Sequence, residues 1–141
     1  MELAQKAKVI LRLRILSLFY IFTLVALDQM LKNSSLHANY GVINNCYILG
    51  KFCLSNVINF FLLLLLLVFL VNIIKLRGYV FALILISAGL ASNLLDRIFR
   101  NGVVDYWKFG FFSNKLINFN LSDILIILGV LLYANRILRH K

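Results

Sequence analysis

Four long apolar stretches, at about residues 9–27, 54–74, 79–95 and 121–135, constrain the fold more than any other feature of the sequence. A transmembrane helix needs about 20 predominantly apolar residues, so the last two stretches need flanking residues or a tilt to span. The composition agrees, because 62% of the residues are hydrophobic and only 14% are charged, which excludes a water-soluble globular domain. We therefore expect an all-α integral membrane protein, a single domain over residues 1–141 with four transmembrane helices.

The first apolar stretch resembles a secretory signal, because Lys6 and Lys8 precede it and Arg12 and Arg14 lie near its start. It ends at Ala26-Leu27-Asp28-Gln29, which lacks the small-residue pattern of a cleavage site. We therefore interpret it as a retained span.

The basic residues indicate the orientation. The chain has a formal net charge of +10. With four spans, the two termini and the turn after the second stretch lie on the same side of the membrane, and nine of the 15 basic residues fall on that side. These nine are Lys6, Lys8, Arg12, Arg14, Lys75, Arg77, Arg136, Arg139 and Lys141. The positive-inside rule then places both termini in the cytoplasm and two loops, at about residues 28–53 and 96–120, outside. In a membrane protein an excess of basic residues indicates which side of the membrane each loop occupies, so we expect no nucleic-acid partner.

Only five acidic residues occur, and apart from Glu2 they all fall on the outer side of this topology. They are Asp28, Asp96, Asp105 and Asp123. An ionisable group at the edge of the hydrocarbon is costly and commonly has a functional reason.

Asp105 and Asp123 are the candidate catalytic pair. Two carboxyls held close together share one proton, so one can activate a water while the other acts as an acid. The alternative for Asp123 is structural, because Asn120-Leu121-Ser122-Asp123 has the spacing of a capping box at the start of the fourth helix. Both roles are compatible, since a helix N-terminus favours a negative charge.

Asn93, Asp96 and Arg97 lie at i, i+3 and i+4 and so share one helix face. The simplest interpretation is a salt bridge that anchors the loop carrying Asp105. In that loop the pair Asn101-Gly102 predicts a turn, and the β-branched residues after it predict a short extended segment.

Asp28 and Lys32 have the i, i+4 spacing of a helix-end ion pair, worth a few tenths of a kcal/mol if it is exposed. The functional alternative is a contact with lipid headgroups. Asn39-Tyr40-Gly41 and Asn44-Asn45 predict turns between short strands in the first outer loop.

Other catalytic chemistry finds no support. His37 and His140 do not make a zinc motif, and the chain has no glycine-rich phosphate loop, so we expect no metal and no cofactor. Cys46 and Cys53, both in the first outer loop, are either a disulfide or two free thiols.

Together these segments resemble the lipoprotein signal peptidase family, also called signal peptidase II, of bacterial plasma membranes. Five motifs of that family occur in order, on the same side of a four-span chain of the family's size. They are D-Q-x-x-K at Asp28, Gln29 and Lys32; N-x-G at Asn39 and Gly41; N-x-x-D-R at Asn93, Asp96 and Arg97; G-x-V-x-D at Gly102, Val104 and Asp105; and a variant of F-N-x-A-D over Phe119-Asn120-Leu121-Ser122-Asp123.

The resemblance implies an aspartyl endopeptidase that removes the signal peptide from diacylglyceryl-modified prolipoproteins, cutting just before the lipidated cysteine. It makes Asp105 and Asp123 the catalytic dyad. It assigns substrate-positioning or dyad-supporting roles to Asn39, Asn93, Arg97 and Asn120, and structural or interfacial roles to Asp28, Lys32, Asp96 and Gly102. The implied partners are the prolipoprotein and the phospholipid bilayer, and the implied fold adds a small extracytoplasmic β-cradle and a short surface helix.

The sequence departs from the family's motifs near the dyad, with Ser122 in place of alanine and Tyr106 in place of phenylalanine. In the first outer loop, Val42-Ile43-Asn44 stands where the family often has Ala-Ala-Phe. A divergent paralogue with altered substrates is therefore an alternative, as is a small membrane carrier or a non-catalytic assembly protein. A carrier would place ionisable residues at several depths, whereas the middles of the last three stretches carry none.

Overall fold

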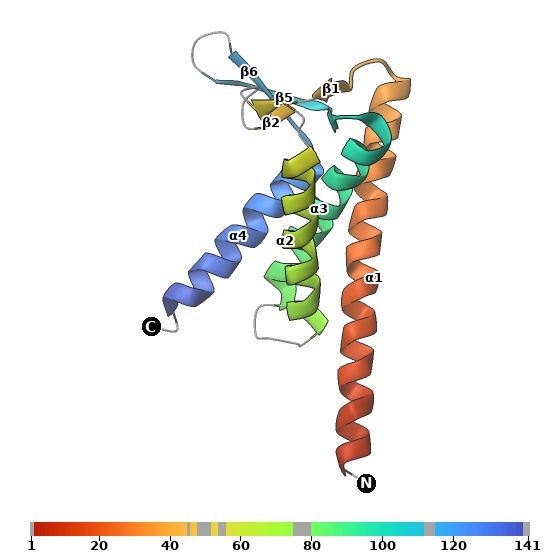
Figure 1. The fold of residues 1–141 in the computed structure, drawn as a ribbon, viewed down its shortest axis with the longest axis vertical. Coiled ribbons are helices and arrows are strands. Elements are labelled where there is room, and N and C mark those ends of the chain that lie inside the picture. Colours follow the sequence, from red (N-terminus) through yellow and green to blue (C-terminus); the bar gives the residue numbers. More distant parts are fainter. Residues whose placement is uncertain are drawn as a thin grey trace.

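The computed structural model describes residues 2–44, 46–47, 52–53, 56–74, 80–111 and 115–139. Four helices form a bundle, and short strands lie at one end of it (Figure 1). The helices are α1 (Glu2–His37), α2 (Asn56–Ile74), α3 (Val80–Arg100) and α4 (Leu121–Arg139). The strands are β1 (Val42–Asn44), β2 (Cys46–Tyr47), β3 (Phe52–Cys53), β4 (Val103–Asp105), β5 (Trp107–Phe111) and β6 (Lys115–Phe119). The four predicted helices are confirmed, and α1, α3 and α4 extend beyond their predicted ends.

Helix α3 is the centre of the bundle. In its most apolar 18-residue window 72% of the residues are buried, against 11% in α1 and 17% in α4. Leu83, Ile84, Leu85 and Ala88 of α3 form the core with apolar residues of the other three helices. The remaining helices therefore pack around α3 and turn most of their apolar side chains outward.

Small residues let α3 and α4 approach closely. A Cβ added at Gly89 would lie 2.5 Å from the backbone oxygen of Ser122, and one at Gly129 would lie 2.6 Å from Cγ1 of Ile86. Glycines thus stand at contacts on both helices. The contact at Gly89 brings the start of α4 against the middle of α3, and small residues allow two helix backbones to approach this closely.

Three of the helices, α1, α3 and α4, are long and apolar enough to cross a membrane by length and composition. Helix α2 is also apolar, but its described apolar part, Asn59–Ile73, is shorter. Large apolar side chains cover the outward faces, among them Phe22, Phe60 and Leu131, each more than 60% exposed. Apolar surface of this extent is typical of a protein whose solvent is lipid.

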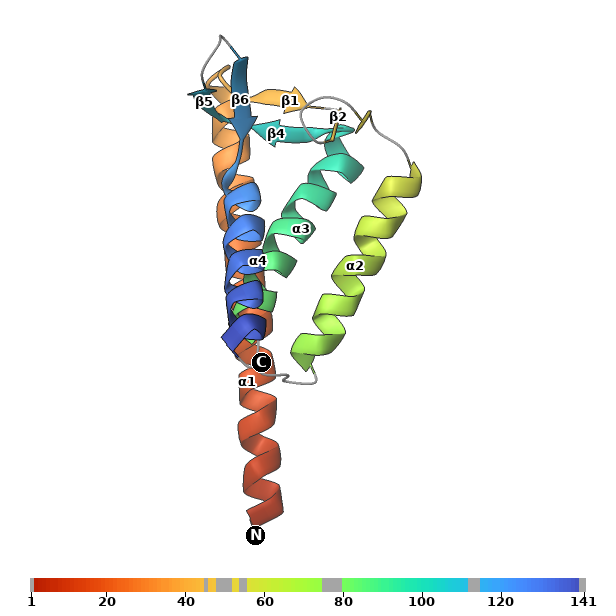
Figure 2. The same cartoon turned by 90° about the vertical axis from the view of Figure 1, so that its left-hand side faces the viewer.

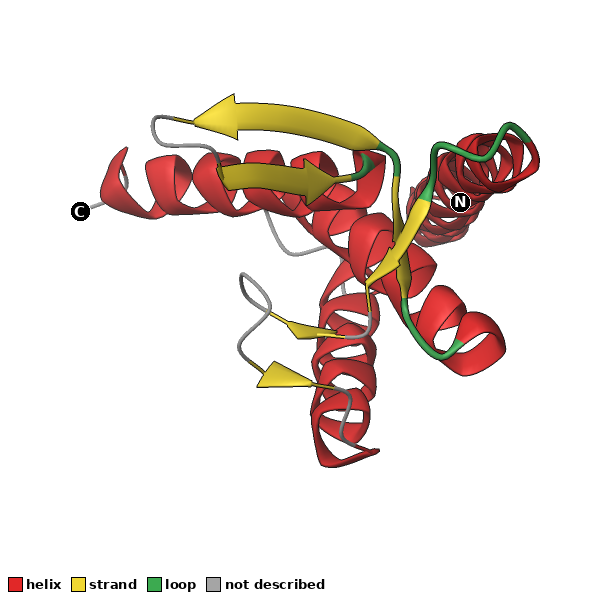
Figure 3. Ribbon diagram, turned by 90° about the horizontal axis from the view of Figure 1, so that it is seen from above, coloured by secondary structure: helices red, strands yellow, loops and turns green. Residues whose placement is uncertain are grey.

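The strands form three antiparallel pairs, β1–β4, β2–β3 and β5–β6. All of them lie at one end of the bundle, and the two chain termini lie toward the other end (Figure 2). Seen from above, the strand pairs spread across the ends of the helices (Figure 3). Beyond the ends of α1 and α3, the described residues of the two outer segments form strands and turns, so the short surface helix implied by the resemblance is not found among them.

Two asparagines end helices in the left-handed conformation. Asn39 follows α1 with a φ of 59°, and Asn101 follows α3 with a φ of 56°. After α1 the N–H groups of Tyr40 and Gly41 both donate to the carbonyl of Ser35, which satisfies the last turn of the helix. The predicted turn at Asn101 is confirmed, and it turns the chain from α3 into strand β4.

Candidate active site

The two candidate catalytic aspartates come from different elements at the strand-bearing end of the bundle. Asp105 is the last residue of β4, which pairs with β1 so that Asp105 stands opposite Val42. Asp123 lies in the first turn of α4. The predicted extended segment after Asn101 therefore exists, and Asp105 is buried at its end.

The predicted capping box is present at the start of α4. The backbone N–H of Asp123 donates to Oδ1 of Asn120 at 3.0 Å, and the N–H of Asn120 donates to Oδ2 of Asp123 at 3.2 Å. These reciprocal bonds satisfy two backbone donors of the first turn. They also fix the Asp123 carboxyl, so the predicted capping role is confirmed and is compatible with a functional one.

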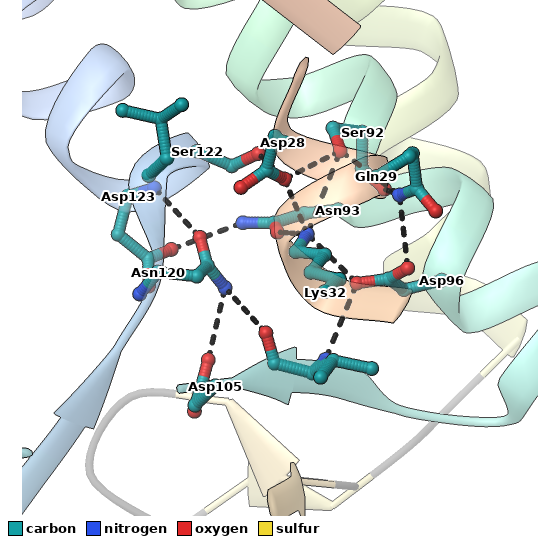
Figure 4. A network of polar contacts seen from close by, with 12 residues as sticks. Asp28, Gln29, Lys32, Ser92, Asn93, Asp96, Asp105, Asn120, Ser122 and Asp123 are labelled. Carbon is teal, nitrogen blue, oxygen red and sulfur yellow. Dashed lines mark hydrogen bonds and ion pairs between the residues drawn. The ribbon is translucent and has the colours of Figure 1, made fainter. Parts of the chain in front are cut away.

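Asn120 connects the two aspartates (Figure 4). Its Nδ2 donates to Oδ1 of Asp105 at 2.9 Å and to the carbonyl of Val104 at 3.3 Å. Since its Oδ1 accepts the N–H of Asp123, one fully buried amide holds β4 and α4 together. The second oxygen of Asp123, Oδ1, accepts Nδ2 of Asn93 at 3.0 Å.

The electrostatics disfavour a negative charge on both carboxyls at once. Burial, and then the negative charge of Asp123, raise the pKa of Asp105 from 3.8 to about 6, against the opposing hydrogen bonds from Asn44 and Asn120. Like charges at close range cannot both ionise cheaply. Within the described ranges, no group of three or more His, Cys, Asp or Glu side chains is arranged to hold a metal ion.

Beneath the dyad lies a buried charge network centred on Lys32. Its Nζ lies 2.7 Å from Oδ2 of Asp28 and 2.7 Å from Oδ2 of Asp96, and it donates to Oδ1 of Asn93 at 2.9 Å. All three charged side chains are fully buried. The predicted i, i+4 ion pair of Asp28 and Lys32 is therefore confirmed. It is buried, because the packing of α1 against α3 encloses both side chains, so the alternative of a headgroup contact is wrong.

Asp96 anchors the strand that carries Asp105, as predicted, but through other partners than expected. Its ion-pair partners are Lys32 and Arg100, and its Oδ2 accepts the backbone N–H of Val104 at 3.2 Å. Arg97 instead donates from Nη1 to the carbonyl of Asn93 at 3.0 Å. The i, i+4 pair in this helix thus involves Arg100, which also donates to Oε1 of Gln29 at 2.8 Å.

Two predicted site residues lie in turns. Asn39 is exposed in the turn after α1, and the hydrogen bonds of the described residues do not join its side chain to the dyad. Gly102 is buried in the turn between α3 and β4. Nearby, a Cβ at Gly41 would lie 2.5 Å from Oγ of Ser35, so glycine permits the close approach there.

Sequence reasoning missed several residues that contact the dyad or its network. Asn44 donates to Oδ2 of Asp105 at 3.5 Å, although the sequence indicated only a turn there. Ser92 of α3 donates to Oδ2 of Asp28 at 2.6 Å. Gln29 donates to Oδ1 of Asp96 at 2.9 Å. The available signals were that Gln29 belongs to the D-Q-x-x-K motif and that Ser92 directly precedes Asn93 of the N-x-x-D-R motif.

The sequence matches the family described as Signal peptidase (SPase) II over residues 20–139. The chain belongs to the signal peptidase II family. The resemblance drawn from the five motifs is thereby confirmed. The lipoprotein signal peptidase of Serratia marcescens is a relative of this chain, 42% identical over 65 residues. That match spans 46% of this chain and 38% of the relative's length.

Two solved structures share the fold of this signal peptidase II family member. Both are described as bacterial membrane enzymes determined by the in meso method, one at 2.3 Å and one at 1.9 Å resolution. The first has a TM-score of 0.76 at 20% identity and covers 87% of each chain. The second has a TM-score of 0.69 at 22% identity and covers 89% of this chain and 94% of the other.

Proposed function

We propose that this protein is an aspartic endopeptidase that removes the signal peptide from diacylglyceryl-modified prolipoproteins and cuts before the lipidated cysteine. The observation that carries the proposal is the pair of carboxyls, Asp105 and Asp123, held together by the buried amide of Asn120. Membership of the signal peptidase II family supports the substrate class.

The dyad cleaves the peptide bond with a water molecule. One carboxylate takes a proton from the water, whose oxygen attacks the scissile carbonyl carbon, and the other carboxyl protonates the departing nitrogen as the C–N bond breaks. Asp105 and Asp123 act as a coupled pair that holds one proton in the resting state, so the two roles belong to the pair. The raised pKa of Asp105, about 6, supports this single-proton state at mildly acidic pH.

The substrate lies with its acyl chains in the bilayer and its signal helix against the spans. Asn93, Asn120 and Arg97 support the dyad or position the peptide, since the first two donate to the catalytic carboxyls. Asn39 is exposed at the same end of the bundle and is a further candidate for contact with the peptide.

All four helices span the bacterial plasma membrane, with both termini in the cytoplasm and the dyad at the outer face. Helix α2 has 19 residues, which at about 1.5 Å each reach about 28 Å, close to the thickness of the hydrocarbon core. The location of both termini toward the end opposite the strands supports an even number of crossings (Figure 1).

The test is cleavage by the full chain in liposomes of a diacylglyceryl-modified prolipoprotein and of its unlipidated twin. We expect the first to be cut and the second to be spared. Asp105→Asn and Asp123→Asn should each abolish cleavage, whereas Glu2→Gln, at the opposite end of α1, controls for the loss of an acid and should cut normally. Cleavage of both twins would remove the lipid requirement, and near-normal turnover in either aspartate variant would overturn the dyad.

A further inference from the structure

Asp28 lies outside the catalytic dyad, yet its buried carboxylate accepts hydrogen bonds from three hydroxyl groups in addition to its ion pair with Lys32. Lys32 Nζ and the hydroxyls of Ser92 and Ser122 all approach Oδ2, at 2.7, 2.6 and 2.6 Å. The hydroxyl of Tyr106 donates to the other oxygen, Oδ1, at 3.0 Å. Two of these donors come from outside α1 and α3, since Tyr106 lies between β4 and β5 and Ser122 lies in α4.

Each of these two hydroxyls stands next to one catalytic aspartate in the chain. Tyr106 follows Asp105 directly, and Ser122 precedes Asp123 directly. A single carboxylate on α1 therefore binds the neighbours of both catalytic residues. In Figure 4 the hydroxyl of Ser122 points to Asp28, on the side of α4 that faces α1 and α3.

Tyr106 also contacts the start of α4 directly. Its hydroxyl accepts the backbone N–H of Leu121 at 3.0 Å while it donates to Asp28, and its own N–H donates to the carbonyl of Phe119 at 3.2 Å. Burial raises the pKa of the Tyr106 phenol, so the hydroxyl keeps the proton that it donates. One side chain thus joins α1, the strand carrying Asp105 and the helix carrying Asp123.

We propose that Tyr106 and Ser122 are positioning residues that set the spacing of the catalytic carboxyls through their shared hydrogen bonds to Asp28. The inference rests on the proposed function, because it assigns Asp105 and Asp123 as the dyad. The hydroxyls do not touch the reacting atoms; they hold the ends of β4 and α4 that carry them. Losing one should change the geometry of the dyad more than the binding of substrate.

The experiment compares Tyr106→Phe, Ser122→Ala and the double variant with the unaltered full chain, in liposomes with the lipidated prolipoprotein. Hydrogen bonds to a buried charge are strong, so we expect kcat to fall about tenfold in each single variant while KM changes less than about twofold. In the double variant kcat should fall by less than the product of the two single decreases, because both hydroxyls act on one carboxylate. Ser122→Thr keeps a hydroxyl and should restore most of kcat.

Two matched controls remove equivalent groups elsewhere. Ser87→Ala deletes a buried serine hydroxyl of α3 that has no hydrogen-bond partner in the described part of the chain. Tyr20→Phe deletes a hydroxyl on the outward face of α1, where Tyr20 is 57% exposed. Both should leave kcat and KM unchanged.

A second readout does not depend on cleavage. A carbodiimide labels protonated carboxyls, so the pH at which half of Asp105 is labelled, read by mass spectrometry, reports the repulsion from Asp123. A larger distance between the two carboxyls weakens that repulsion. The pH at which half of Asp105 is labelled should therefore fall by about half a unit in both hydroxyl variants but in neither control. Unchanged midpoints and kcat, or a loss seen in KM alone, would overturn the positioning role. A wild-type chain that does not cut the prolipoprotein would instead refute the proposed function and leave the labelling result standing by itself.

Discussion

Removal of the buried ammonium group of Lys32 is the sharpest test of the charge network. The side chain lies between Asp28 and Asp96, 2.7 Å from each, and all three are fully buried. With Arg100, which pairs with Asp96, the four charges sum to zero. Lys32→Met leaves one negative charge uncompensated in the interior.

The expected cost follows from that imbalance. Removing one partner of a buried ion pair costs about 3–5 kcal/mol, which lowers the ratio of folded to unfolded protein about 100- to 4,000-fold. Lys32→Met/Asp28→Asn restores neutrality and keeps a polar side chain for the hydroxyls around position 28. It should therefore be more stable than Lys32→Met alone, with a coupling free energy of about 2 kcal/mol.

The measurement is reversible unfolding of the full chain in mixed micelles, followed by the fluorescence of Trp107, the single tryptophan of the sequence. The control is Lys108→Met, which removes an ammonium group at an exposed position of β5, outside the network. It should change stability by less than about 0.5 kcal/mol. A loss below about 1 kcal/mol for Lys32→Met, or strictly additive effects in the double variant, would refute the reasoning.

Three further predictions concern pH, the helix cap and the helix interface. Because the pKa of Asp105 is about 6 when folded and 3.8 ordinarily, the folded state binds the proton more tightly, and stability falls as pH rises through this window. At about 1.4 kcal/mol for each pH unit the loss amounts to about 3 kcal/mol, and unfolding in micelles from pH 4 to 7 should show this slope in the wild type but not in Asp105→Asn. Asn120→Ala removes the cap of α4 and the amide that bridges the dyad, so it should cost about 1 kcal/mol of stability and lower kcat in the liposome assay; unchanged kcat would contradict the bridge. Gly129→Val places a Cβ 2.6 Å from Cγ1 of Ile86 and should cost about 1–3 kcal/mol in thermal unfolding, whereas an unchanged midpoint would show that α3 and α4 adjust freely.

The helices and the capping box could be predicted because they depend on neighbours in the sequence. Apolar stretches of spanning length specify the helices, and the spacing of Asn120 and Asp123 specifies the reciprocal bonds that begin α4. The turn at Asn101 followed from local backbone preference in the same way.

The partners of the charged residues could not be predicted in this way. From the sequence, Asp28 and Lys32 resembled an ordinary exposed i, i+4 pair, and Asp96 had Arg97 as its nearest cation. In the structure Lys32 is enclosed between α1 and α3 and bridges two aspartates, and the i, i+4 partner of Asp96 is Arg100. Burial and choice of partner depend on how the helices are rotated against each other, which local spacing does not determine.

The positions of Cys46 and Cys53 are a second example of a relation that the sequence did not determine. The backbone register places them directly opposite each other on β2 and β3, a relation that their separation in sequence did not specify. Their side chains lie outside the described residues, so the choice between a disulfide and two thiols stays as the sequence left it.

The sequence by itself determined that this chain is a membrane protein of the signal peptidase II family, because apolar length and motif order are properties of the chain. Only the tertiary structure decided that Asn120 joins Asp105 to Asp123, and that Tyr106 and Ser122 meet at Asp28. The physical reason is that these side chains come from different elements. Their distances are set by the packing of α1, α3 and α4 around small residues, and only that packing removes them from water.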